Sequence, residues 1–244
     1  MLDKEVGETP LECLERERAR LVAAGHREFA EIPMTYAGRL DPMAEGKLLI
    51  LVGDECKEKE KYLGLDKEYE VEIVFGIATD TYDVLGIIKK VDDKKVVDSF
   101  IESIPTRYVD KFDQPYPPFS SKPVSGKPLF EHARANTLDD IEIPTKQVEI
   151  YSIIMLGGQN KIGVTIADEA LIKIAKVRGD FRQKEIIAGW HNFQNKYAQT
   201  IFKSITLGIF CSSGTYMRSL AEKMGKDTGV GAMALSIKRI RISD

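Results

Sequence analysis

Apolar and polar residues alternate along much of the chain with the period of two that is typical of β-strands. Between residues 68 and 75, aromatic or aliphatic side chains occupy the odd positions, and glutamates occupy the even positions as far as 72. Such alternation predicts a half-buried strand. The other segments predicted as strands are 148–156, 161–167, 205–209 and 235–242, and the apolar run 47–53 is either a strand or the start of a helix. A Gly-Gly-Gln-Asn turn at 157–160 is expected to join the first two.

Other segments follow the helical period of about 3.6 residues. The first helix is expected to start at Thr9, which can form a capping box with Glu12, and to end near Gly25. The further helices are predicted at 97–104, ending before Pro105, at 169–194 in two pieces broken near Gly179, and from 213–215 to Gly225. The proline-rich passage 105–128 follows neither period and is expected to be an ordered surface loop.

The predicted strands and helices are interspersed without the strand–helix–strand rhythm of parallel sheets. This order favours an α+β fold, with a central, mostly antiparallel sheet flanked by helices and loops. The 244 residues contain no internal repeat and no long linker, which indicates one domain.

The composition is that of a soluble globular chain, with 43% hydrophobic and 30% charged residues. No run approaches the roughly 18 apolar residues of a membrane span, and the N-terminus lacks the pattern of a secretory signal. The cysteines, Cys13, Cys56 and Cys211, are odd in number and far apart, which argues against disulfides and against a Cys-x-x-Cys metal site. A cytoplasmic protein without a membrane partner is expected.

The net charge of −3 argues weakly against a nucleic-acid partner, because proteins that bind phosphate backbones usually carry a basic excess. The charges are unevenly distributed, however. Residues 173–184 hold five lysines or arginines against one aspartate, and residues 238–241 (KRIR) form a second basic cluster. Each cluster is either an RNA contact or solvated surface.

Residues 38–46 (GRLDPMAEG) form the segment most indicative of chemistry. Pro42 has a fixed φ and biases Asp41 away from helical geometry. Gly38 and Gly46 permit backbone paths, and a close approach of a bulky ligand, that a side chain would prevent. Because Asp-Pro pairs are also common in ordinary turns, this loop alone leaves a structural and a catalytic aspartate both open.

The loop resembles the G-x-L-D-P signature of the TruB family of tRNA pseudouridine synthases, and further blocks follow in the family's order. Residues 2–10 (LDKEVGETP) are similar to its opening DKP-x-G-x-T segment, with Glu5 where proline is usual. Residues 67–71 (KEYEV) resemble its K-x-Y strand, 117–134 resemble its PP-x-YSA-x-K block that ends in Ala-Arg, and 211–220 (CSSGTYMRSL) resemble CSKGTYIRSL. The chain is therefore identified as TruB-like.

The resemblance implies the pseudouridine synthase fold, with one catalytic domain over residues 1–244. It also implies a helical insertion at about 169–200 that grips the RNA. The family usually continues into a small C-terminal RNA-binding domain, and this accessory domain is expected to be absent.

The resemblance further implies that a uridine in the tRNA T-loop, at position 55, is converted to pseudouridine. Asp41 is the expected catalytic residue, Arg218 its counter-ion, and Tyr69 the ring that lies against the target base. The residues expected to bind substrate are Tyr36, Arg39, Lys122, Lys127, Arg134 and Ile237, with Tyr36 standing where the family's better-known form has histidine. No cofactor and no metal are expected, the partner is the T-arm of tRNA, and the chain is expected to be a monomer.

Several alternatives remain open at this point. The chain could be a catalytically silent RNA-binding or RNA-folding protein of the same fold, or a pseudouridine synthase for another RNA. It could also be a carboxylate-dependent hydrolase of nucleosides or sugars, which would need a second carboxylate to activate water, and no such partner is fixed at short sequence spacing. Asp41 could attack C1′ or remove the 2′ proton to give a glycal, and the sequence does not choose between these routes.

Overall fold

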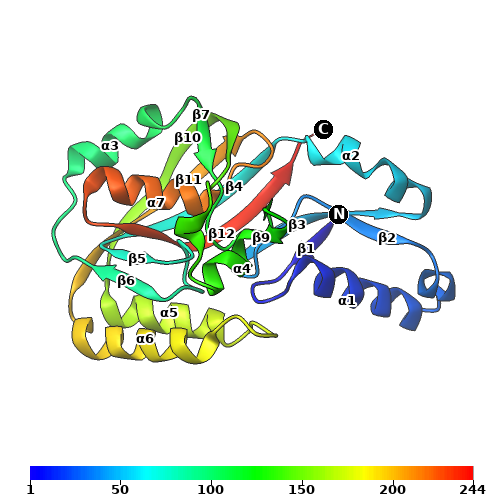
Figure 1. The fold of residues 1–244 in the computed structure, drawn as a ribbon, viewed down its shortest axis with the longest axis horizontal. Coiled ribbons are helices and arrows are strands. Elements are labelled where there is room, and N and C mark those ends of the chain that lie inside the picture. Colours follow the sequence, from blue (N-terminus) through cyan, green and yellow to red (C-terminus); the bar gives the residue numbers. More distant parts are fainter. Residues whose placement is uncertain (244) are drawn as a thin grey trace.

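The computed structural model describes residues 1–243, and its centre is a mixed eight-stranded sheet (Figure 1). The strands run in the order β1-β3-β12-β4-β11-β10-β7, with β2 paired to β3. Their bounds are β1 Leu2–Lys4, β2 Met34–Ala37, β3 Ala44–Val52, β4 Lys67–Phe75, β7 Lys111–Pro115, β10 Thr145–Ile162, β11 Ile201–Cys211 and β12 Ala232–Ile242. All pairs are antiparallel except β3 with β12. The predicted α+β fold with a mostly antiparallel sheet is confirmed.

Helices cover both faces of this sheet. The helices are α1 Pro10–Ala23, α2 Lys59–Leu63, α3 Asp98–Arg107, α4 Leu129–Arg134, α5 Gly163–Ile174, α6 Gln183–Tyr197 and α7 Met217–Thr228. The alternation along β4 sends Val71 and Ile73 into a core shared with α3 and α7, and sends Val74 into a second core shared with α5 and α6. In Figure 1 these two helix pairs lie on either side of the central strands.

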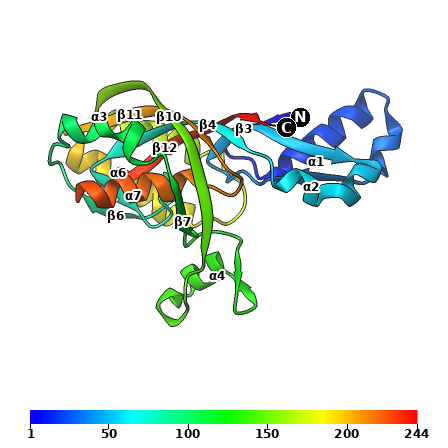
Figure 2. The ribbon, with the colours of Figure 1, turned by 90° about the horizontal axis from the view of Figure 1, so that it is seen from above.

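Between β7 and β10 the chain leaves the body of the molecule. Residues 116–144, here called the finger, contain the short strands β8 (Pro123–Val124) and β9 (Lys127–Pro128) together with α4. Figure 2 shows the finger projecting from the sheet at the ends of β7 and β10. The base of the finger is fixed because β7 pairs with residues 145–149 of β10. A separate hairpin, β5 (Ile77–Thr79) with β6 (Ile88–Val91), packs near β12.

Two local expectations are confirmed. The side chain of Thr9 accepts from the Glu12 amide at 3.2 Å, and the Glu12 carboxylate accepts from the Thr9 amide at 2.7 Å, so the capping box is complete. The two helices α5 and α6 are separated by a loop in which Gly179 has a φ of +81°.

The expected turn at 157–160 is wrong. β10 continues through it as one strand to Ile162, and α5 begins at Gly163 where a strand had been predicted. The glycines instead lie at an irregularity in the pairing with β11, between Met155 and Gly157. Because β11 offers hydrogen-bonding partners along this whole stretch, the strand does not need to turn.

Three boundaries also differ from expectation. The α3 helix continues past Pro105 to Arg107, and the supposed loop 105–128 contains β7 and the β8–β9 hairpin. Gly225 does not end α7, which continues to Thr228 and is followed by Gly229 at a φ of +76°. A Cβ at Gly225 would lie 2.1 Å from the Ala232 amide nitrogen, so this glycine permits a close approach to β12 rather than a helix end.

Candidate active site

Asp41 lies in the loop between β2 and β3, and its backbone is fixed from both sides. The Asp41 carbonyl accepts from the Ala44 amide at 3.0 Å, which closes a tight turn at the start of β3. The Pro42 carbonyl accepts from the Gly7 amide at 2.8 Å. The N-terminal segment therefore supports the loop that carries the candidate carboxylate.

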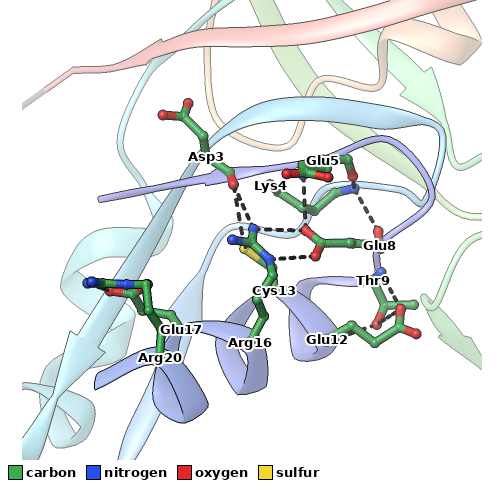
Figure 3. Close-up of polar contacts among 10 residues, drawn as sticks. All are labelled: Asp3, Lys4, Glu5, Glu8, Thr9, Glu12, Cys13, Arg16, Glu17 and Arg20. Carbon is green, nitrogen blue, oxygen red and sulfur yellow. Dashed lines mark hydrogen bonds and ion pairs between the residues drawn. The ribbon is translucent and has the colours of Figure 1, made fainter. Parts of the chain in front are cut away.

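The turn that contains Gly7 is itself held by a buried lysine (Figure 3). Lys4 is 1% exposed, and its Nζ donates to the carbonyls of Glu5 at 2.8 Å and Glu8 at 2.6 Å. Burial lowers the pKa of Lys4 to about 8. The Glu8 carboxylate accepts from the Glu5 amide at 3.0 Å and pairs with Arg16 at 2.6 Å. A proline at position 5, which is usual in the segment that residues 2–10 resemble, has no backbone N–H and could not donate this hydrogen bond to Glu8.

The side chain of Arg239, in β12, also holds the loop that carries Asp41. Its guanidinium donates to the carbonyls of Gly38, Arg39 and Lys47 at 3.2, 3.3 and 2.6 Å. The residue is 1% exposed, so of the two readings left open for the basic cluster 238–241, solvated surface does not apply to Arg239. Gly46 completes the contact, because a Cβ there would lie 2.3 Å from the Arg239 carbonyl oxygen and its φ is +100°.

Asp41 and Arg218 form an ion pair, with 2.8 Å between Oδ2 and Nε. The Arg218 side chain is 3% exposed and that of Asp41 is 37% exposed, so the carboxylate faces solvent while the guanidinium is buried. Arg218 lies in the first turn of α7 and also donates to the carbonyls of Thr81 at 2.8 Å and Phe119 at 3.5 Å. Burial opposes its charge, but the two nearby aspartates outweigh burial and raise the pKa of Arg218.

The second of these aspartates, Asp83, was missed by the sequence analysis. Its Oδ2 lies 3.6 Å from Arg218 Nε, and its Oδ1 accepts from the Thr81 hydroxyl at 2.7 Å and the Leu85 amide at 2.9 Å. Burial raises the pKa of Asp83 to about 6, although Arg218 and Thr81 act in the opposite direction. The polar run at 79–83 between two apolar segments was the only signal available.

Activity should fall as the pH drops through about 6, where Asp83 takes up a proton. While Asp83 is ionised it shares the Arg218 charge, which leaves Asp41 less stabilised and therefore more reactive. The Asp83→Asn variant should remain in the low-pH state, with kcat lower by roughly 10- to 100-fold. A pH–rate profile of both enzymes measures this. An acid limb that stays near pH 6 in the variant would assign the limb to another group.

Tyr69 and Ile237 line a cleft of about 540 Å³ that opens beside Asp41 and Arg218. Tyr69 is 8% exposed and burial raises its pKa, so its hydroxyl remains protonated. The basic residues along the cleft are Arg39, Lys67, Lys122, Lys146, Arg218 and Arg239, and Asp41 is the one acidic residue among those that line it. The cleft therefore favours an anionic ligand in spite of the net negative charge of the chain.

The remaining residues predicted to bind substrate are divided between two places. Tyr36 and Arg134 line a second cavity of about 420 Å³ that shares Arg39 and Asp41 with the cleft. Arg134 belongs to the finger and pairs with Asp180 at 3.3 Å. Lys127 is exposed on β9 and lines neither cavity.

Only some of the basic side chains in the stretch 173–184 remain free to bind a ligand, because two of them already have partners within the protein. Lys173 donates to the Leu235 carbonyl at 2.6 Å, and Arg182 pairs with Asp80 at 2.8 Å.

Among residues 1–243 no group of three His, Cys, Asp or Glu side chains could hold a metal ion. No helix in this part of the chain has both the length and the hydropathy that a membrane crossing requires.

Comparison with known proteins places this geometry in context. Residues 27–181 match the family model described as TruB family pseudouridylate synthase (N terminal domain). The chain is 27% identical to tRNA pseudouridine synthase B of Ralstonia pickettii over 246 residues, 30% to that of Aromatoleum aromaticum over 244, and 26% to that of Aquifex aeolicus over 246. These alignments cover 99–100% of this chain but 62%, 62% and 68% of the relatives.

Two solved structures share the fold. The protein matched in a Cbf5-Nop10-Gar1 complex has a TM-score of 0.52 and 16% identity, covering 98% of this chain and 47% of its own. That in an archaeal box H/ACA sRNP Nop10-Cbf5 complex has a TM-score of 0.50 and 15% identity, covering 99% of this chain and 46% of its own. At these identities the likeness concerns the fold alone.

Proposed function

This chain belongs to the TruB family of pseudouridylate synthases, and from that premise we propose that it converts the uridine at position 55 of the tRNA T-loop to pseudouridine. The observation that carries the proposal is the Asp41–Arg218 pair at the edge of a basic cleft lined by Tyr69. The relatives named tRNA pseudouridine synthase B support tRNA as the substrate. The proposal includes that the protein acts on tRNA as a monomer and in the cytoplasm.

The reaction rearranges one nucleotide without any other reactant. The N1–C1′ bond breaks, the uracil turns, and C5 forms a bond to the same C1′. C5 then loses its proton, and N1 gains one, so atoms and electrons balance within the nucleotide.

Asp41 is the group proposed to act on the ribose. Its side chain is the exposed member of the ion pair, so it can reach C1′ or the 2′ hydrogen. Both the covalent route and the glycal route use an ionised carboxylate. Arg218 donates from Nε to the Asp41 carboxylate at 2.8 Å and so fixes its direction.

Tyr69 and Ile237 are proposed to hold the uracil between them while it turns. Both are side chains of central strands, β4 and β12, and Val71 of β4 pairs directly with Ile237. A uridine within the folded T-loop must first be extruded to reach the cleft. Tyr36 in the adjoining cavity offers a flat ring that can stack on a base.

The geometry disfavours the two main rivals. Asp83 is a second carboxylate near Asp41, but its Oδ1 already accepts two hydrogen bonds, its Oδ2 faces Arg218 at 3.6 Å and its side chain is 6% exposed, so it is not placed to activate a water molecule. A hydrolase needs such a water. A silent RNA-binding protein would have no need to keep Asp41 paired with a buried arginine.

One assay distinguishes isomerisation of the uridine from hydrolysis of its glycosidic bond. The purified chain is incubated with unmodified tRNA, and the products are separated as nucleosides and free base. We expect pseudouridine to form with no release of uracil. Free uracil would identify a hydrolase, and tRNA binding with neither product would identify the silent protein.

Lys122 should contribute to RNA affinity through its charge. Its Nζ lies over the ring of Tyr116, 5.2 Å from the centroid, at the side of the cleft. Replacing Lys122 by Gln should weaken tRNA binding and reduce the slope of log Kd against log salt by about 0.7 to 0.9. The control is Lys94→Gln, since Lys94 is exposed and lines neither cavity. Equal slopes for the two variants would remove Lys122 from the RNA interface.

A further inference from the structure

The hydroxyl of Ser120 is buried in the finger without any hydrogen-bonding partner. The residue is 4% exposed and lies among those that line the cleft with Asp41 and Tyr69. Within residues 1–243, one other buried side-chain polar atom lacks a partner, and it belongs to Ser243, the last residue described. Ser120 is thus the exception in the interior of the fold.

Such a hydroxyl is unfavourable for the free protein. A buried polar group that forms no hydrogen bond retains its desolvation penalty, which is on the order of 1–3 kcal/mol. An alanine at position 120 would fill nearly the same space without that penalty. The contacts of the Ser120 hydroxyl therefore show no contribution to the stability of the free protein.

The backbone of Ser120 is held firmly beside the reacting groups. Its carbonyl accepts from the Phe130 amide at 3.1 Å, which ties it to the start of α4. The preceding carbonyl, of Phe119, accepts from Arg218, and the Phe119 ring lies 4.1 Å below the Arg182 guanidinium. The finger therefore presents position 120 next to the Asp41–Arg218 pair.

We propose that Ser120 is a substrate-binding residue whose hydroxyl forms a hydrogen bond with the target nucleotide when RNA occupies the cleft. This inference rests on the proposed function. A serine hydroxyl can both donate and accept, and it can rotate among the staggered χ1 positions without moving the backbone. The nucleotide then supplies the partner that the free protein lacks.

Removing the Ser120 hydroxyl should affect the stability of the free protein and its activity in opposite ways. In Ser120→Ala, the melting temperature of the free protein should equal or exceed that of wild type, because no hydrogen bond is lost. The same variant should lose about 3- to 10-fold in kcat/KM for tRNA, which is the usual net effect of one hydrogen bond.

Ser204→Ala provides the matched control. Ser204 is 1% exposed on β11, away from the cleft, and its hydroxyl donates to Glu72 at 2.7 Å. This variant should lower the melting temperature by about 2–4 °C and leave kcat/KM unchanged. Opposite responses of the two serines would support the proposal.

Three results would overturn it. The first is a Ser120→Ala enzyme with wild-type kcat/KM, the second is a loss of stability in that variant similar to that in Ser204→Ala, and the third concerns the affinity for tRNA. Binding of the same tRNA is measured in parallel by its Kd. If wild type formed no pseudouridine, the proposed function would fail, and an unchanged Kd in Ser120→Ala would separately reject the hydrogen bond.

Discussion

The Asp41→Asn variant should form no measurable pseudouridine, with kcat lower by on the order of 10⁴-fold or more. An amide neither attacks C1′ nor removes a proton at neutral pH, so both routes open to Asp41 are blocked. The fold should be unaffected, because the Asn oxygen can still accept from Arg218 Nε, which lies 2.8 Å from the native carboxylate. Single-turnover conversion of tRNA under saturating enzyme measures the chemical step directly.

The control for Asp41→Asn is Asp3→Asn. Asp3 is an exposed aspartate whose side chain pairs with Lys47 on the surface. Both variants should melt within about 2 °C of wild type and bind tRNA with similar affinity, while only Asp41→Asn loses turnover. Wild-type turnover by Asp41→Asn would remove this carboxylate from the mechanism.

Replacing Arg218 by Met should abolish activity and also destabilise the fold in a pH-dependent manner. The change leaves Asp83 buried without a counter-ion, and breaking such a pair costs about 3–5 kcal/mol. Asp83 already has a folded pKa of about 6, above the 3.8 of the unfolded chain, and loss of Arg218 raises it further. The folded state then holds its proton more tightly, so the contribution of Asp83 to the variant's stability is complete below about pH 4 and is lost as the pH rises through the folded pKa.

A double variant distinguishes the two roles of Arg218. Adding Asp83→Asn removes the buried charge, so Arg218→Met/Asp83→Asn should recover most of the stability at pH 8 and none of the activity. Urea unfolding at pH 5 and pH 8 measures the first effect, and single-turnover conversion measures the second. A single variant equally stable at both pH values, or activity in the double variant, would contradict this account.

Local sequence signals predicted local structure well. The alternation on β4 and the Thr9 capping box depend on neighbours within a few residues, and both are present in the structure. The family resemblance is confirmed by the match over residues 27–181. The catalytic and binding roles assigned to individual residues remain predictions.

The failures share a physical cause, which is that the deciding contact is distant in sequence. Gly225 seemed to be a helix end because the close approach of Ala232 is a tertiary contact. Gly157 seemed to start a turn because the local sequence does not show its pairing with Thr206 of β11, about 50 residues later in the chain. Nothing in the sequence indicated that Arg239 is buried, because two of the carbonyls that it binds lie about 200 residues earlier.

Asp83 was missed for the same reason, and the role proposed for Ser120 likewise depends on contacts that are distant in sequence. An aspartate in a polar loop and a serine in a proline-rich passage are ordinary in sequence. Both become notable only when the loop, the finger and α7 meet around Arg218. Spacing alone could not have found them.

The most direct test of the central claim is to map pseudouridine at nucleotide resolution in an unmodified tRNA transcript after incubation with the wild-type chain. We expect a single modified position, the T-loop uridine at position 55, formed without added metal or cofactor. Pseudouridine at other positions would show that the substrate assignment is wrong, and a transcript without any pseudouridine would contradict the account as a whole.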